Sequence, residues 1–502
     1  MATKLNLQAL RRRSAPVPPA HRDTDFDPMR KRVIMLQEGV PRKAAKYVLY
    51  WMQIHRRAYQ NQALNFALTQ ANALRLPLVV YEGLRPDYEQ ANDRMHQFII
   101  EGALDNRRDF TKRGMRYCFY LMPDADTGNR RAVAQLAQEA ALLVTDDFPT
   151  FIIPQHNRAI VKQVDCPVYA VDANGVVPMR ELDHEEYAAR TIRPRIHRLL
   201  PAYFWPIAEV APKIKSLALP LNLGEETALE NADLQVLVAA TNIDHSVAPS
   251  RHFHGGRKAA LARLKTFLSE RLQNYAAGRN LAGEHWTSEL SPYLHFGHIS
   301  AMEVAWEVLH AEAPPECIDA FLEEHIVRRE LSYNFCHFNK KHASLEALPA
   351  WARQTLFAHE KDQRAYLYTS KQFEQAATHD ELWNLTQREL LATGKIHGYM
   401  RMLWGKKIIE WSASPQEAMA TMIRFHHRYA LDGRNPNTYT GILWCFGKHD
   451  RAWGPQRPIY GLVRYMASEN TKRKINFRAY REWVESCESE QRGKINRQVS
   501  LY

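Results

Sequence analysis

The sequence predicts an α/β N-terminal domain with a Rossmann-like parallel sheet, followed by a larger all-α domain. Its length points to two domains, because 502 residues are too many for one simple hydrophobic core. Up to about residue 190, short apolar runs rich in β-branched residues alternate with amphipathic stretches. From residue 226 onward, helical periodicity dominates the chain.

The strands of the first domain are expected at five apolar runs. These are VIMLQ (33–37), LPLVVYEGL (76–84), RYCFYLM (116–122), ALLVTDD (141–147) and PVYAVD (167–172). The stretch AAKYVLYWMQIHRRAYQNQALNFALTQANAL, between the first two, is expected to be an amphipathic helix. Such a βαβ rhythm predicts parallel strands with helices on both faces of the sheet. No G-x-G-x-x-G and no Walker sequence is present, so an ordinary dinucleotide or triphosphate loop is not expected.

Changes in composition and in hydrophobic periodicity divide the chain into five segments. Residues 191–225 are rich in proline and poor in strand pattern, which is typical of an interdomain connector. The other segments are a flexible basic arm (1–30), the α/β domain (31–190), the helical domain (226–470) and a basic C-terminal tail (471–502).

Composition narrows the class of protein. Six cysteines are scattered without a C-x-x-C pair, which argues against a zinc ribbon or an iron–sulfur cluster and suits a reducing cytoplasm. No apolar run reaches the roughly 20 residues that a membrane helix needs, and the N-terminus lacks a signal-peptide core. We therefore expect a cytoplasmic protein without a membrane partner.

Positive charge makes a polyanion a plausible partner. The formal net charge is +12, with a sequence pI of about 9.3. Basic residues gather at 251–258, 328–329, 406–407 and 472–481, where aromatic residues interleave with the last cluster. Each basic cluster alone could be a solvated helix face. The four clusters taken together favour DNA binding.

Three tryptophans stand out in the helical half. Trp404 and Trp411 are seven residues apart, which places them on one helix face about 10 Å apart along the axis. Trp383 comes from the preceding helix, which we expect to begin with a Thr378–Glu381 capping box and to end at Gly394. Such a row can carry single electrons between the surface and a buried redox cofactor. Core packing would give the same spacing.

Six sequence blocks, in order, resemble those of class II cyclobutane pyrimidine dimer photolyases, members of the photolyase/cryptochrome family. The blocks are YWMQIHRRAYQNQAL (50–64), TSELSPYLHFGHIS (287–300), FLEEHIVRRELSYNFC (321–336), THDELWN (378–384), GKIHGYMRMLWGKKIIEW (394–411) and KHDRAW with RPIYGLVRYM (448–453, 457–466). The resemblance extends from about residue 33 to 466.

The resemblance implies a light-driven DNA repair flavoprotein. It implies FAD buried in the helical domain and an antenna pigment, of the deazaflavin or folate type, in the N-terminal domain. The reaction is transfer of one electron from reduced FAD to a cyclobutane pyrimidine dimer flipped out of DNA, which splits the ring. The implied protein is a monomer that needs no metal.

The resemblance also assigns residues around the flavin. It implies a cradle for FAD and an electron-carrying row in which Trp404 is proximal, Trp383 next and Trp411 outermost. Arg401 and Asp432 match a salt-bridged pair beside the flavin ring, although an ordinary structural ion pair would look the same in a sequence. The cradle residues are Tyr275, Thr287, Ser288, Leu290 and Ser291.

Five further positions match groups that contact DNA. Glu324 matches the acid that hydrogen-bonds a pyrimidine of the lesion. Met402 and Trp444 match side chains that pack on the flipped bases. Arg451 and Arg464 match basic groups near the gap that flipping leaves. Without the motifs, these residues would be interpreted as surface charge and core packing.

The chain departs from the family pattern near the flavin. Asn is usual where His426 stands, and Asp is usual where His427 and Asn435 stand. Because a histidine ordinarily titrates near neutrality, His426 could alter the redox state of the flavin by exchanging a proton. The alternative is that it only replaces one hydrogen bond and that repair survives.

The leading interpretation is a photolyase. A cryptochrome-like blue-light photoreceptor on the same fold, with weak or no repair activity, is the main alternative, and the tryptophan row serves either function. A helical nucleic-acid-binding protein without cofactor would explain only the charge.

Overall fold

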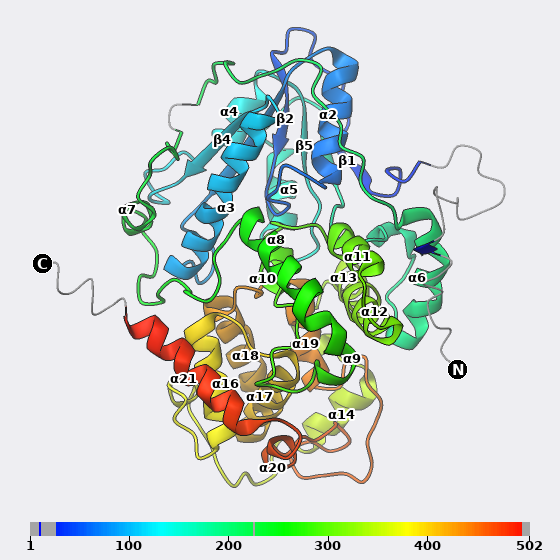
Figure 1. Cartoon of the computed structure of the whole chain (residues 1–502), viewed down its shortest axis with the longest axis vertical. Coiled ribbons are helices and arrows are strands. Elements are labelled where there is room, and N and C mark those ends of the chain that lie inside the picture. The colour runs from blue at the N-terminus through cyan, green and yellow to red at the C-terminus, as the bar shows by residue number, and fades with distance from the viewer. Residues whose placement is uncertain (1–9, 12–26, 224–225, 494–502) are drawn as a thin grey trace, which may run out of the picture.

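The computed structural model describes residues 10–11, 27–223 and 226–493 (Figure 1). Most of the expected basic arm (1–30) and the end of the expected tail (494–502) lie outside these residues. The sheet and its helices form one half of the molecule and a larger set of helices forms the other (Figure 1). The predicted fold class is therefore confirmed.

The N-terminal half is built on one six-stranded sheet with the order β1-β6-β5-β2-β3-β4. Its strands are β1 (Val33–Gln37), β2 (Tyr47–Trp51), β3 (Leu78–Leu84), β4 (Arg116–Leu121), β5 (Ala140–Asp146) and β6 (Val168–Val171). All neighbouring pairs are parallel except β1 and β6, which run antiparallel. The sheet is thus mixed, with one antiparallel edge strand where a wholly parallel sheet was expected.

One prediction for this half was wrong. The stretch expected to be a single helix contains β2, a central strand, and the helix α2 begins only at Gln62. The run YVLYW is almost fully buried and lies between β3 and β5. A strand buried on both faces has no polar alternation, so its sequence resembles a buried helix.

Helices cover both faces of the sheet, as predicted. Side chains of alternate strand residues, such as Val48 and Leu49 of β2, belong to different hydrophobic clusters. The cluster with Val48 includes α2 and α3, and the cluster with Leu49 includes α4 and the end of α5. The bounds are α2 (Gln62–Leu74), α3 (Asp93–Lys112), α4 (Ala132–Ala137) and α5 (Ile153–Ile160).

The rest of the described chain is helical and irregular. Helix α6 (Ala189–Tyr203) occupies much of the proline-rich segment that was expected to be a connector. Helix α7 (Leu234–Ala239) packs beside α3 in the sheet half (Figure 1). Figure 1 shows the remaining helices gathered on the side of the molecule away from the sheet. They are α8 (Arg257–Thr266), α9 (Tyr275–Gly278), α10 (Ser291–His295), α11 (Ala301–His310), α12 (Pro315–Leu322), α13 (Arg329–Phe338), α14 (Ala350–Ala358), α15 (Ser370–Glu374), α16 (Glu381–Thr393), α17 (Gly398–Trp411), α18 (Pro415–Tyr429), α19 (Pro436–Cys445), α20 (Ser468–Lys472) and α21 (Phe477–Gly493).

Helices α16 and α17 carry the tryptophans. The side chain of Asp380 caps α16 by accepting the amide of Trp383 at 2.9 Å, so the expected Thr378–Glu381 capping box was wrong. Thr378 instead bonds the side chain of Asn384. The predicted end at Gly394 is confirmed, since this residue adopts φ +84°, a left-handed conformation that suits glycine.

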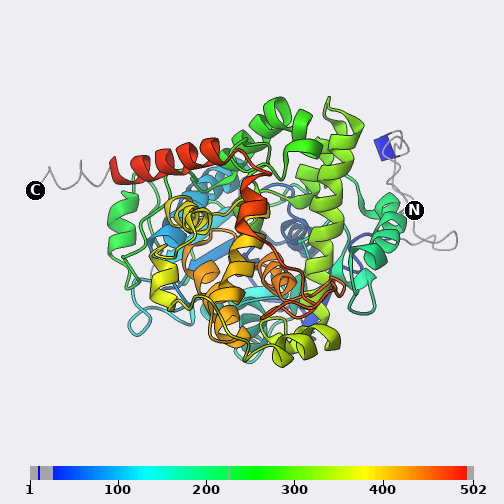
Figure 2. The same ribbon diagram turned by 90° about the horizontal axis from the view of Figure 1, so that it is seen from below.

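The last described helix, α21, packs along α16 on the outside of the helical half (Figures 1 and 2). Its Tyr480 is fully buried, and the Tyr480 hydroxyl donates to the Glu389 carboxylate of α16. Burial raises the pKa of Glu389 to about 7, although the Tyr480 hydroxyl counteracts this effect. Part of the expected basic tail is therefore an integral helix of the domain.

Candidate functional site

The three tryptophans form a continuous row. The rings of Trp404 and Trp383 are stacked with centroids 6.4 Å apart and planes within 4°, and Trp383 meets Trp411 at 6.0 Å. Two hydrogen bonds fix the rings: Trp383 Nε1 donates to the Trp404 carbonyl, and Trp404 Nε1 donates to Gln387. The order in space is therefore Trp404, Trp383, Trp411, and we call this set the tryptophan row.

A largely buried ion pair lies one helical turn from Trp404, the inner end of the row. Arg401, which precedes Met402 on α17, donates from one Nη atom to both carboxylate oxygens of Asp432 at 2.9 Å. Burial raises the pKa of Asp432, but the charges of Arg401 and Lys395 outweigh it and bring the value to about 2. The carboxylate is therefore ionised at neutral pH, and the site contains a fixed, compensated pair of charges.

His426 contacts the inner end of the row and lies near the ion pair. Its ring meets Trp404 edge-on with centroids 5.3 Å apart. Nδ1 lies 2.8 Å from the Met422 carbonyl, which can only accept, so Nδ1 carries the proton. Burial, aided by Arg401, lowers the pKa of His426 to about 4. The ring is therefore neutral at pH 7, unlike the histidine titrating near neutrality that the sequence suggested.

His427 and Asn435, which stand where the family usually has Asp, do not share the surroundings of His426. Burial lowers the pKa of His427 to about 3, and its Nε2 lies 3.1 Å from the Tyr439 hydroxyl. Asn435 caps α19 and also lies 3.3 Å from a ring nitrogen of His295. Both side chains thus make structural contacts, while His426 faces the tryptophan row.

The residues present fit a large polar cofactor such as FAD. His426 Nε2 and Arg401 Nε are buried and have no hydrogen-bond partner among the described residues. Leaving such atoms unpaired costs free energy, so their presence at one site indicates a ligand that would pair them. Arg401 would offer a donor and His426 an acceptor, which matches the mixed donors and acceptors of a flavin ring.

The expected cradle residues lie on two short elements of the same half. Tyr275 begins α9, is buried, and packs against Phe321 with centroids 5.3 Å apart. Thr287, Ser288 and Leu290 form the turn before α10, which begins at Ser291. Ser291 lies against the Asp432 carboxylate, so this turn meets the Arg401 ion pair.

Glu324 lies at a groove of about 400 Å³ between α6 and the α12–α13 region. Its carboxylate is 42% exposed and lies 4.0 Å from Arg279, whose guanidinium in turn lies over the ring of Tyr275. Arg328, one turn after Glu324, places its guanidinium 5.3 Å from the ring centre of Trp444. The structure therefore brings Glu324 and Trp444 to the same region through Arg328, which the sequence reasoning had grouped only with general basic charge.

Met402 joins the same region. It follows Arg401 on α17, and Cys445, next to Trp444, lies against the Met402 carbonyl. Both Met402 and Trp444 are partly exposed rather than core residues. Side chains that stay partly exposed at a site are available for a ligand.

Arg451 and Arg464 flank one indole. Their guanidinium carbons lie 4.4 and 5.0 Å from the ring centre of Trp453. Both arginines lie at the surface or close to it. Two of the basic clusters were in part misinterpreted, because Lys406, Lys407 and Arg329 are buried and bond protein groups instead.

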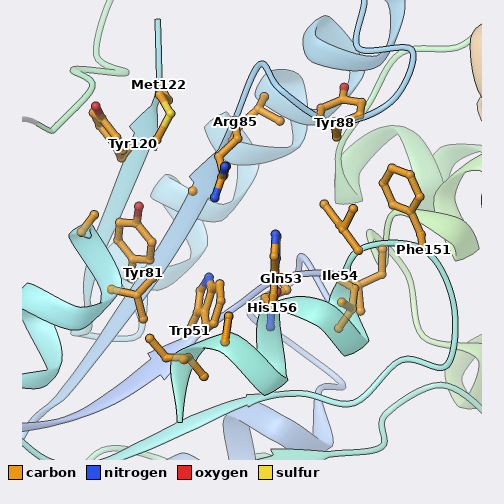
Figure 3. A pocket seen from close by; sticks show the side chains of 18 of the residues that line it. Trp51, Gln53, Ile54, Tyr81, Arg85, Tyr88, Tyr120, Met122, Phe151 and His156 are labelled. Atoms are coloured by element: carbon orange, nitrogen blue, oxygen red, sulfur yellow. The ribbon is translucent and has the colours of Figure 1, made fainter. Parts of the chain in front are cut away.

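A second cavity, of about 180 Å³, lies in the N-terminal half (Figure 3). It is bordered mainly by the ends of β2, β3 and β4 and by α5, and also by His295, Phe296 and Arg434 of the helical half. We call it the N-terminal cavity. Trp51 and His156 stand side by side in it, with Tyr81, Tyr120 and Met122 to one side and Tyr88 and Phe151 to the other (Figure 3).

The N-terminal cavity is aromatic with a few polar groups. Trp51 and His156 are stacked with centroids 5.7 Å apart, and burial lowers the pKa of His156 to about 4. The Tyr88 hydroxyl and Arg434 Nε are buried without hydrogen-bond partners among the described residues. Sequence reasoning named no residue here, because these side chains come from several strand ends that only the sheet brings together.

Comparison with known proteins identifies the class. A sequence model described as DNA photolyase matches residues 48–213. A deoxyribodipyrimidine photo-lyase of Methanothermobacter thermautotrophicus is 39% identical, over 90% of this chain and 97% of that protein. Two solved structures share the fold: a Synechocystis cryptochrome (TM-score 0.66, 16% identity, 89% of each chain) and a Sulfolobus tokodaii photolyase described with two FAD molecules (TM-score 0.58, 15% identity, 82% of this chain and 86% of that one).

The fold is thus that of photolyases and cryptochromes, with a sheet domain and a helical domain. The chain belongs to the DNA photolyase family, as the sequence resemblance predicted. Membership implies FAD as the cofactor and DNA as the partner. Across the described residues, no helix is long and apolar enough to cross a membrane.

Proposed function

We propose that this protein repairs cyclobutane pyrimidine dimers in DNA under blue or near-ultraviolet light. The observation that carries the proposal is that Glu324, Met402 and Trp444, all partly exposed, lie in one region next to the Arg401 ion pair. The relative from Methanothermobacter, which is similar over nearly its whole length, is named for this activity.

Bound FAD would supply the light-driven one-electron chemistry. Arg401 would lie against the ring as a permanent cation, held by Asp432, and would favour an added negative charge there. His426 would offer its Nε2 lone pair as a hydrogen-bond acceptor. The turn from Thr287 to Ser291 and the Tyr275 ring would hold the remainder of the cofactor.

The tryptophan row would conduct electrons inward to that site. Trp404 would give up the first electron. Trp383 would then reduce oxidised Trp404, and Trp411 would reduce oxidised Trp383. The ring centroids are 6.4 and 6.0 Å apart, and hydrogen bonds hold the Trp383 and Trp404 rings, so little rearrangement is needed.

Glu324, Met402 and Trp444 would hold the flipped lesion. The exposed Glu324 carboxylate can accept hydrogen bonds from pyrimidine N–H groups, and the Trp444 ring provides a face for stacking. Arg451 and Arg464 would contact the DNA backbone beside the flipped lesion. We also expect the protein to act as a monomer, and its cytoplasmic location stays a prediction.

The N-terminal cavity would hold an antenna pigment. Its stacked aromatic walls suit a planar conjugated ring, and its unpaired Tyr88 hydroxyl and Arg434 Nε would bond ring oxygens. Deazaflavin and folate pigments both have such rings. An absorption spectrum of the purified protein would report whether a second pigment accompanies FAD and of which type.

The cryptochrome alternative rests on His426, where the family usually has Asn. Glu324, Met402 and Trp444 favour repair, because a photoreceptor needs no group that contacts a pyrimidine dimer. The class II assignment rests on the sequence blocks and stays part of this proposal.

Illumination of the reduced protein with an oligonucleotide containing a thymine dimer tests the function directly. We expect restored thymines in the product, and no restoration in a protein with reduced FAD would contradict repair. Trp404→Phe should abolish photoreduction of oxidised protein but leave repair by chemically reduced protein intact. Trp351→Phe is the control, because Trp351 packs against the same hydrophobic cluster but lies outside the row.

A further inference from the structure

The tryptophan row does not reach the surface. Its outermost member, Trp411, is only 3% exposed, so an electron entering the row from outside must first cross another group. Two rings lie against Trp411 on its outer side: His379, with centroids 5.0 Å apart, and Tyr368, at 5.8 Å. The Tyr368 amide also donates to the Trp411 carbonyl at 3.0 Å, which fixes this segment against the end of α17.

The Tyr368 hydroxyl is paired with His379. It lies 2.7 Å from His379 Nδ1 and also accepts the His379 backbone N–H at 2.9 Å. Because the phenol oxygen already accepts this backbone bond, its own proton is free to point at Nδ1. An imidazole that accepts a phenol hydrogen bond can take the proton when the phenol is oxidised.

The pair is open to solvent on its far side. Tyr366, which is 47% exposed, stacks on His379 with centroids 3.6 Å apart. Tyr366, His379 and Trp411 all border one surface groove of about 600 Å³. An external reductant can therefore reach His379 and Tyr366 from this groove, whereas Trp383 and Trp404 are not among the residues that border it.

A neighbouring cation disfavours positive charge on Trp411. The Lys407 ammonium lies 5.5 Å from the Trp411 ring centre and is bonded to Glu410 at 2.6 Å. Burial lowers the pKa of Lys407, but its bond to Glu410 outweighs this and raises it overall, so Lys407 stays charged. Since the Glu410 carboxylate offsets part of this charge, the remaining repulsion favours electron transfer from a neutral neighbour to oxidised Trp411 only modestly.

Another tyrosine near Lys407 borders the groove and lacks such a proton acceptor among the described residues. Tyr465 lies beside the same ammonium, with its ring centre 5.0 Å from Nζ and its hydroxyl 3.3 Å from it. Since an ammonium only donates, Lys407 cannot take a proton from Tyr465. Tyr465 is therefore a natural comparison for Tyr368.

We propose that Tyr368, with His379 as its proton acceptor, is the terminal electron donor of the tryptophan row. This proposal rests on the proposed function, which supplies the oxidant by drawing one electron inward from Trp404. Oxidised Trp411 takes one electron from the Tyr368 phenol and becomes neutral. The O–H bond of Tyr368 breaks as an N–H bond forms at His379 Nδ1, which leaves a neutral tyrosyl radical and an imidazolium. An external thiolate that enters the groove then gives one electron to the tyrosyl radical and leaves as a thiyl radical, and the proton returns from His379 to the phenol oxygen.

Time-resolved electron paramagnetic resonance of the illuminated holoenzyme tests the proposal. In the wild type we expect a tyrosyl radical to appear as the tryptophan radical decays, with slower formation in D₂O. In Tyr368→Phe the tyrosyl signal should be lost and the tryptophan radical should persist. His379→Asn keeps an acceptor near Nδ1 but no base, so it should slow tyrosyl formation.

Tyr465→Phe and Tyr366→Phe are the matched controls and should keep the wild-type signal. A persisting tryptophan radical in the wild type, or a tyrosyl signal unchanged in Tyr368→Phe, overturns this proposal alone. Absence of any protein radical in the wild type, together with unchanged flavin absorbance on illumination, overturns the proposed photoreduction as well. Tryptophan fluorescence and flavin content confirm that each variant is folded.

Discussion

The two candidate cofactor sites of this protein are built in opposite ways. The N-terminal cavity is bordered by stacked aromatic rings from strand ends, with polar groups at its margins. The site in the helical half is organised around a buried ion pair, Arg401 with Asp432, and polar atoms that the protein leaves unpaired. An aromatic cavity tolerates several planar ligands, while unpaired buried atoms need one ligand with matching donors and acceptors. We infer that the helical site is the more selective and the more important for stability.

The strongest test of this comparison is to break the ion pair. Asp432→Asn leaves the Arg401 guanidinium buried without a counter-charge, which should cost about 3–5 kcal/mol in the free energy of unfolding and cause loss of flavin. Urea denaturation and flavin absorbance measure the two effects. Glu346→Gln, which removes an exposed carboxylate paired with Lys341, should leave both unchanged. If both variants lost the same unfolding free energy and the same amount of flavin, the Arg401–Asp432 pair would be no more important than an exposed ion pair.

The pH dependence of stability sharpens the comparison. Because the folded-state pKa of Glu389 is raised from 4.5 to about 7, its contribution is fully present below pH 4.5 and is lost as the pH rises through about 7. The shift corresponds to about 3 kcal/mol. Glu389→Gln should flatten this part of the stability profile, measured as the melting temperature from pH 4 to pH 8.

Glu330 provides the matched variant for this profile. Burial raises its pKa to about 7 as well, and it accepts the Val177 amide, so it joins the helical half to the segment after β6. Glu330→Gln should flatten the profile to a similar degree while leaving the α21 contact intact. A profile unchanged in both variants would show that these carboxyls are not buried in the folded protein.

The N-terminal cavity should respond more mildly. Trp51→Val removes the ring that stacks on His156 but suits the strand β2, so we expect a cost of about 1–3 kcal/mol and loss of any second pigment. Flavin content and repair at wavelengths that FAD absorbs should be unchanged. If flavin were lost together with the second pigment, the two sites would not be independent.

The smallest expected effect concerns His426. Its ring is neutral at pH 7 and offers only an acceptor at Nε2, whereas Asn would offer both an acceptor and a donor. His426→Asn should therefore shift the absorption spectrum or the photoreduction rate of the bound flavin with little change in stability. Identical spectra and kinetics would favour the view that the histidine merely replaces a hydrogen bond.

Some features could be predicted because they depend on local pattern. Five of the six strands correspond to short apolar runs, and Gly394 ends its helix where only a left-handed residue fits. The strand β2 was missed because burial on both faces removes alternation from its sequence. Lys406 and Lys407 were misjudged because a charged side chain gives no sequence sign of being buried.

The sequence alone determined the family and the identity of the tryptophans, because six ordered blocks are specific and side-chain chemistry can be stated without coordinates. Only the tertiary structure decided which groups are neighbours. It placed Arg328 on Trp444, assembled the N-terminal cavity from separate strand ends, and set Tyr368 and His379 beside Trp411. The physical reason is that contacts between distant segments, and the burial that shifts pKa values, arise only when the chain folds back on itself.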